Sequence, residues 1–60
     1  MNAKFQINKD AAGEYRFTLI SPNGQTIAVS EGYTTKDNAM NGVASVRENA
    51  SAAVLDDKTA

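Results

Sequence analysis

The chain has 60 residues, six of them Lys or Arg and seven Asp or Glu, with a formal net charge of -1. It contains no cysteine and no histidine, which excludes disulfides, thiolate metal sites, and the commonest zinc ligand and general base. A chain of this length buries only about 60% of the surface that it exposes when unfolded, so we expect a second copy to complete the core. The basic residues are scattered among acidic ones, which argues against tight binding of nucleic acid.

Three alternating segments predict a three-stranded antiparallel sheet. Lys4–Lys9, Glu14–Ser21 and Gln25–Glu31 alternate apolar with polar side chains, the pattern of strands that are buried on one face. Short stretches of turn-forming residues separate them, so the strands are expected to follow one another as a meander. The expected apolar face consists of Phe5, Ile7, Tyr15, Phe17, Leu19, Ile27 and Val29.

The pair Asn23-Gly24 allows two registers between the second and third strands. Asn-Gly is the strongest signal for a two-residue hairpin loop. That loop would pair Leu19 with Ala28 and Phe17 with Ser30. The large apolar residues of the third strand would then lie on the opposite face, because a one-residue shift in register reverses the faces.

A three-residue loop, Pro22-Asn23-Gly24, is the alternative. It places Pro at its favoured second turn position and Gly in the left-handed site. It pairs Leu19 with Ile27 and Phe17 with Val29, which unites the apolar face. We therefore predict the three-residue loop.

The first hairpin is expected to use the same kind of loop. Ala11-Ala12-Gly13, closed by Asp10 and Glu14, also ends in a Gly at the left-handed site. This loop pairs Ile7 with Phe17 and Phe5 with Leu19.

A helix is predicted to begin near Thr34 or Thr35, because Thr34-Thr35-Lys36-Asp37 resembles a capping box. Asn49 is the expected C-terminal cap, in the left-handed conformation that Asn tolerates. Gly42 costs about 1 kcal/mol relative to Ala in mid-helix, so we expect it to allow close approach to a strand or another helix. The apolar helix face comprises Ala39, Val43, Val46 and Ala50.

The rest of the chain completes one domain. Ala52–Asp56 is a candidate for a short last strand, and residues 58–60 are expected to be a frayed tail after a single domain over 1–57. We find no signal peptide pattern and no apolar run of membrane-spanning length, so the expected location is the cytoplasm without a membrane partner. The predicted fold class is α+β: a three-stranded antiparallel meander followed by one helix (β-β-β-α) on one sheet face, as a two-fold homodimer.

The residues also resemble the YegP-like family of small uncharacterised prokaryotic proteins over about Phe5 to Asn49. The resemblance implies a β-β-β-α repeat, which some members carry twice in tandem, whereas single-repeat members form homodimers. It implies no enzymatic activity. The motifs that carry it are Glu14-Tyr15-Arg16-Phe17, Asn23-Gly24-Gln25, Ile27, Ser30-Glu31, Tyr33-Thr34-Thr35-Lys36 and Asn41-Gly42-Val43-Ala44-Ser45-Val46-Arg47.

Candidate site residues are few. Ser30, Tyr33, Gly42, Arg47 and Asn49 lie near the end of the third strand and on the helix, where they could form a dimer seam or a small partner surface. Capping and packing within one chain is the alternative role for them. No catalytic, cofactor-binding or metal-binding residue is predicted.

These observations predict a homodimeric structural or interaction module with no catalysis, no cofactor and an unidentified protein partner. Histidine and cysteine are absent, and the serines lack a base to activate them. The alternative is a weak nucleic-acid or anion-binding protein that uses Lys4, Arg16 and the start of the helix.

Overall fold

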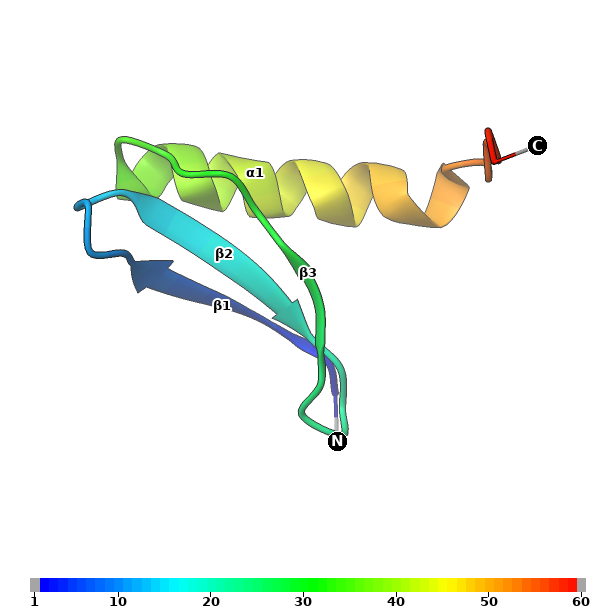
Figure 1. Ribbon diagram of the computed structural model, residues 1–60, viewed down its shortest axis with the longest axis horizontal. Coiled ribbons are helices and arrows are strands. Elements are labelled where there is room, and N and C mark those ends of the chain that lie inside the picture. The colour runs from blue at the N-terminus through cyan, green and yellow to red at the C-terminus, as the bar shows by residue number, and fades with distance from the viewer. Residues whose placement is uncertain (1, 60) are drawn as a thin grey trace.

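The computed structural model describes residues 2–59, and Met1 and Ala60 lie outside the described residues. Three antiparallel strands in the order β1-β2-β3 are followed by one helix (Figure 1), so the predicted α+β architecture is confirmed. The elements are β1 (Lys4–Lys9), β2 (Tyr15–Ile20), β3 (Thr26–Val29), α1 (Lys36–Asn49) and the 3-10 turn η1 (Ala50–Ala52).

The β1–β2 hairpin has the predicted loop and the predicted register. The Asp10 N–H donates to the Glu14 carbonyl at 2.8 Å, which closes a three-residue loop. Gly13, the last residue of that loop, has φ of +84°, a conformation that side chains disfavour. The predicted pairs are confirmed: Phe5 lies opposite Leu19 and Ile7 lies opposite Phe17.

The loop between β2 and β3 is also the predicted one. The Ser21 N–H donates to the Gln25 carbonyl at 2.8 Å, and the Gly24 N–H donates to the Ser21 carbonyl at 2.9 Å. Gly24 has φ of +90°. The three-residue loop is therefore confirmed over the two-residue one that Asn-Gly alone favours.

The predicted pairing beyond this loop is wrong. Ile20 pairs with Thr26, as the loop requires, but the next residue of β2, Leu19, pairs with Ala28. The residue between, Ile27, is the extra residue of a β-bulge. The Leu19–Ile27 and Phe17–Val29 pairs do not form, and Ile27 and Val29 are 59% and 61% exposed.

Two hydrogen-bonded anchors explain the bulge. The loop fixes Ser21 opposite Gln25, whereas further along the Ser30 N–H donates to the Phe17 carbonyl at 2.9 Å. Between these anchors the third segment contains one residue more than β2. The surplus residue must leave the ladder, and it does so at Ile27.

α1 begins at the predicted position, but the predicted capping box over residues 34–37 does not form, and the end of the helix also differs from the prediction. Thr35 is the N-cap, and its Oγ1 accepts from the Asn38 N–H at 3.1 Å. At the other end Asn49 has φ of −102°, so the predicted left-handed cap is wrong. The Asn49 Nδ2 instead donates to the Ser45 carbonyl at 2.8 Å, and the chain continues without a break into η1.

The core is small and lies at one end of the sheet. Among residues 2–59 the buried hydrophobic side chains are Phe17, 7% exposed, and Ala39, fully enclosed. The Phe17 ring meets the Phe5 ring edge to face and stacks on Tyr33, with ring centroids 6.0 and 6.2 Å apart. Figure 1 shows α1 beside the start of β2, while the strands run away from its C-terminal half.

The predicted last strand, Ala52–Asp56, does not form in the described chain. The residues after η1 have neither helical nor strand structure up to Thr59, and Val54 and Leu55 are 87% and 93% exposed. The reason is geometric: α1 carries this segment away from the sheet, so no strand edge of the same chain lies beside it (Figure 1). The predicted frayed tail, 58–60, is described only as far as Thr59.

A substitution at Gly42 tests how closely α1 packs against the sheet. A Cβ at this position would lie 2.6 Å from Tyr33 Oη and 2.9 Å from Phe17 Cε2. We expect Gly42→Ala to destabilise the fold by about 1–2 kcal/mol, because overpacking outweighs the gain in helix propensity. Urea denaturation measures this, with the exposed neighbour substitution Asn41→Ala as control. Stabilisation by Gly42→Ala would mean that the helix can move away from the sheet without cost.

Candidate functional site

An apolar groove lies between the sheet and the C-terminal half of α1. Its volume is about 340 Å³. Ser30, Glu31, Tyr33 and Val29 are among the residues that line it. The groove itself is defined by the side chains that make it apolar, which are Phe5, Phe17, Leu19, Ala28 and Val46.

The β-bulge creates this groove. Because the register shifts at Ile27, the small side chain of Ala28 lies opposite Leu19, where a large one was predicted. Paired residues of adjacent strands share a face, so the sheet lacks one bulky group on the helix side. The small side chain of Ala28 therefore leaves open space beside Leu19.

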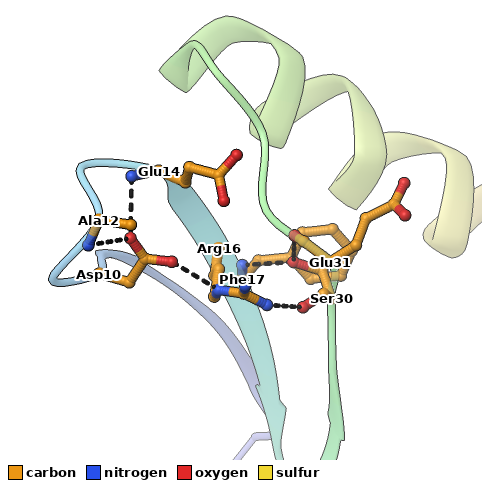
Figure 2. A network of polar contacts seen from close by, with 7 residues as sticks. All are labelled: Asp10, Ala12, Glu14, Arg16, Phe17, Ser30 and Glu31. Atoms are coloured by element: carbon orange, nitrogen blue, oxygen red, sulfur yellow. Dashed lines mark hydrogen bonds and ion pairs between the residues drawn. The ribbon is translucent and has the colours of Figure 1, made fainter.

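A polar network holds the neighbouring turn and the end of β3 together (Figure 2). The Arg16 Nε donates to Asp10 Oδ2 at 2.8 Å, and the Arg16 guanidinium also donates to the Ser30 carbonyl at 3.1 Å. The other oxygen of Asp10 accepts from the Ala12 and Glu14 N–H groups at 3.0 and 2.9 Å. One carboxylate and one guanidinium thus connect the first loop to the third strand.

This network shifts the pKa of both charged groups. The hydrogen bond from Arg16, followed by the bond from the Glu14 N–H, lowers the pKa of Asp10 below its usual value. The hydrogen bond to Asp10 raises the pKa of Arg16. Both groups are therefore held in their charged forms, which suits a structural ion pair and not a proton-transfer site.

Ser30 replaces part of the strand ladder with its side chain. Its Oγ accepts from the Phe17 N–H at 2.9 Å and donates to the Glu31 carbonyl at 2.8 Å. The Ser30 carbonyl, which a regular ladder would use for Phe17, is occupied by Arg16. The backbone pairing of Phe17 therefore depends on a hydroxyl group.

The predicted site residues do not form one cluster. Tyr33 and Gly42 meet beside Phe17, and Tyr33 and Ser30 both line the groove. Arg47 and Asn49 are exposed on α1. The contacts of Ser30, Tyr33 and Gly42 are made within one chain, and a role for any of the five at a dimer seam remains a prediction.

Sequence reasoning missed the groove and the Asp10–Arg16 pair. The groove depends on Ala28, which the predicted register placed on the polar face. The role of Asp10 in its loop could have been predicted, because an Asp at the first position of a turn commonly accepts hydrogen bonds from the backbone N–H groups of the residues that follow it. Nothing local in the sequence indicated that Arg16 would join Asp10 to Ser30.

The described residues were also compared with the requirements of a metal site and of a membrane-spanning helix. Across residues 2–59, the acidic side chains do not gather in a group of three or more that could hold a metal ion. None of the helices found there has the length and apolar character needed to cross a membrane. A second, open hollow of about 460 Å³ at the β2–β3 loop has Lys4 as its one charged lining residue.

Comparison with known proteins gives consistent matches. Residues 10–57 match the family model described as a domain of unknown function, DUF1508. The UPF0339 protein of Methanosarcina acetivorans is 48% identical over 80% of this chain and 83% of the relative. The UPF0339 protein in the ptx operon 5' region of Stutzerimonas stutzeri is 52% identical over 83% of this chain but only 45% of the relative. The chain thus spans about half the length of this longer relative.

The UPF0339 protein YegP of Escherichia coli is a further match, 47% identical over 75% of this chain and 41% of the relative. Among solved structures, the NMR solution structure of a protein from Haloferax volcanii superposes with a TM-score of 0.86 at 41% identity. It covers 95% of this chain and 98% of that one. The β-β-β-α fold is therefore shared with an experimentally determined structure.

Ser30→Ala should be destabilising although it removes a single oxygen atom. The Phe17 N–H would lose its acceptor, and an unsatisfied donor in a partly buried site costs about 1–3 kcal/mol. Urea denaturation followed by circular dichroism measures the loss. Ser45→Ala on the exposed face of α1 is the matched control and should change stability by less than about 0.5 kcal/mol. Equal effects of the two substitutions would contradict the role assigned to the Ser30 hydroxyl.

The Asp10–Arg16 pair should make stability depend on pH in the acid range. Because the pKa of Asp10 is lowered in the folded state, its contribution is fully present above its unfolded pKa, near 3.8, and is lost as pH falls through the folded pKa. Asp10→Asn keeps an acceptor oxygen but removes the charge. In this variant the melting temperature should therefore change less with pH in this range than it does in the wild-type chain.

Asp57→Asn is the control for this measurement. The pKa of Asp57 is also lowered, by hydrogen bonds from Thr59. Those bonds join residues two apart, so they can persist in the unfolded chain and give little linkage to folding. A pH profile that Asp57→Asn flattens as much as Asp10→Asn would refute the assignment.

Proposed function

Because the chain belongs to the DUF1508 family, whose function is unknown, we propose that it acts as a cytoplasmic homodimer, an interaction module without catalytic activity. In this proposal a second copy of the chain covers the apolar groove, and the dimer presents its remaining surface to an unidentified protein partner. The groove is the observation on which the proposal rests.

The small core supports association. A chain of this size exposes much of its apolar surface even when folded, and here Phe17 and Ala39 are the buried hydrophobic residues among residues 2–59. Large apolar side chains remain exposed beside the groove and beyond it. They are Ile27, Val29, Met40, Val54 and Leu55. Of these, Val29 lines the groove and Ile27 precedes the groove residue Ala28 in β3, so the apolar surface of the groove extends onto the edge strand. An exposed apolar surface of this kind commonly marks a protein interface.

The open side of β3 gives the second copy a place to dock. β3 is an edge strand with four residues, all of them exposed, including the apolar Ile27 and Val29. An exposed apolar edge readily pairs with another chain. In a two-fold dimer the same surfaces meet on both copies, so the groove and the edge strand would be covered together.

The C-terminal segment would find its partner in the same dimer. Val54 and Leu55 are 87% and 93% exposed. The segment after α1, to which they belong, leads away from the sheet of the same chain (Figure 1). The sequence pattern of this segment favours a strand, and a strand needs a neighbouring edge. A second sheet supplied by the other copy would provide one.

The lengths of the relatives agree with a two-copy unit. This chain covers 83% of the relative from Methanosarcina acetivorans but 45% of the one from Stutzerimonas stutzeri. The family therefore includes proteins of about the size of this chain and others about twice as long. A dimer of the short form would match the long form in size.

The geometry does not favour nucleic-acid or anion binding. That alternative needs Arg16 to face a phosphate, but its guanidinium already donates to Asp10 and to the Ser30 carbonyl. The aromatic rings of Phe5 and Phe17 lie against each other on the helix side of the sheet and give no open stacking platform.

Light scattering coupled to gel filtration tests the proposal, and the wild-type chain should have twice the monomer mass at micromolar concentration. Ala28→Lys places a charged chain in the groove at an exposed edge position and should shift the protein to monomer. Ala11→Lys, the same change in an exposed loop, should leave the dimer intact. Circular dichroism of both variants shows whether they fold. A monomeric wild-type chain would reject the proposal.

A further inference from the structure

The chain contains two Asn-Gly pairs in very different surroundings. Asn23-Gly24 forms the tip of the β2–β3 loop, whereas Asn41-Gly42 lies inside α1. We infer that Asn23 is a site of spontaneous deamidation in the folded protein and that the helix protects Asn41. The reaction does not depend on the proposed function, because Pro22, Asn23 and Gly24 belong neither to the groove nor to the edge strand β3.

The reaction needs only water and the chain itself. The Gly24 nitrogen, once it has lost its proton, attacks Cγ of Asn23, and a C–N bond forms as the bond from Cγ to Nδ2 breaks. Ammonia leaves with the transferred proton, and a five-membered succinimide remains. Water then adds to either ring carbonyl and opens the ring, which gives an aspartate or an isoaspartate at position 23. No oxidant or reductant takes part.

The loop brings the reacting atoms together. The Gln25 N–H donates to Asn23 Oδ1 at 3.2 Å, which closes an Asx turn. The hydrogen-bonded ring of the Asx turn includes both Cγ of Asn23 and the Gly24 nitrogen. Attack at Cγ therefore begins from a side chain that is already folded back over the following peptide bond.

The same loop stabilises the charge that develops during attack. As Cγ becomes tetrahedral, negative charge grows on Oδ1 of Asn23. Ser21 Oγ forms a hydrogen bond with this oxygen, beside the one from the Gln25 N–H. Donors that already point at an oxygen on which charge will form lower the barrier to such a step.

One bond opposes the reaction and sets its rate. The Gly24 N–H donates to the Ser21 carbonyl at 2.9 Å, and this bond must open before the nitrogen can lose its proton. The loop residues Pro22, Asn23 and Gly24 are exposed, and apart from Gly24 and its two chain neighbours no residue has an atom within 4 Å of the position where a Gly24 Cβ would be. Opening of an exposed turn needs little free energy compared with global unfolding.

Asn41 is exposed too, but its backbone cannot follow the same path. A helical ψ near −42° must change greatly before the next nitrogen can approach Cγ, and the helix is held by its bonds between residues four apart. Even a Cβ on Gly42 would lie within 3.0 Å of Tyr33 and Phe17 atoms, so the backbone there has little room to move without disturbing the core. Exposure alone therefore does not decide which Asn reacts.

The remaining asparagines are poorer sites. In each of them the following residue has a Cβ, which crowds the attacking nitrogen. These pairs are Asn2-Ala3, Asn8-Lys9, Asn38-Ala39 and Asn49-Ala50.

The product would alter the hairpin tip. Both products, aspartate and isoaspartate, place a carboxylate in the β2–β3 loop. The charged residue that lines the open hollow at this loop is Lys4. The isoaspartate form also adds a carbon atom to the main chain just before the Ile27 bulge, where the register is already set by two competing anchors.

The test is incubation of the full-length wild-type chain in mildly alkaline buffer, with peptide mapping by mass spectrometry and enzymatic labelling of isoaspartate. We expect the mass gain from amide to acid at Asn23, more than about tenfold faster than at Asn41, because opening an exposed turn costs less than opening a packed helix. In denaturant the two Asn-Gly pairs should react at similar rates.

Asn23→Ser is the matched variant, since Ser keeps a turn-forming side chain without an amide. It should abolish the mass gain of the folded protein and leave the reaction of Asn41 in denaturant unchanged. Equal rates at the two sites in the folded chain, or no product at Asn23 while the denatured chain converts, would overturn the inference.

Discussion

Phe17 is the residue on which the sheet, the connecting segment and the helix converge. Its ring packs against Phe5 and stacks on Tyr33, and it lies where a side chain at Gly42 would have to be. Its backbone bonds to Ser30 in both directions, through the Ser30 N–H and through the Ser30 hydroxyl. Since Phe17 is one of very few buried residues among those described, the position of α1 depends on this single contact region.

The bond pattern around Phe17 also determines the surface of the protein. Ser30 is fixed opposite Phe17 and Gln25 opposite Ser21, and the two constraints differ by one residue. The bulge at Ile27 resolves the difference, and it places Ala28 on the helix side of the sheet. The groove that we propose as the dimer contact is therefore a consequence of hydrogen bonding at both ends of β3, and not of a choice among apolar residues.

The features that could be predicted are those that neighbouring residues decide. Both hairpin loops follow from Gly at the left-handed position and, in the second, Pro before it. The helix start follows from Thr35. The pairing of β3 could not be predicted because it depends on the Ser30 hydroxyl and on Arg16, which act across the sheet. The predicted register was wrong because it assumed that the strand pairs so as to bring all apolar residues to one face. Here hydrogen bonds to the Ser30 side chain set the register.

The same distinction between local sequence and surroundings applies to the ends of the helix and to the two Asn-Gly pairs. Asn49 can adopt a left-handed cap, but a bond from its side chain to Ser45 keeps it helical. Gly24 uses the conformational freedom of glycine, with φ of +90°, whereas Gly42 stays within a helix and uses only its small size against Tyr33. A short chain with a small core therefore assigns different roles to identical dipeptides through a few contacts. Because those contacts are concentrated around Phe17, segments far from it, such as the hairpin tip and the C-terminal segment, are held least by their own chain and are the parts most open to chemistry or to a second copy.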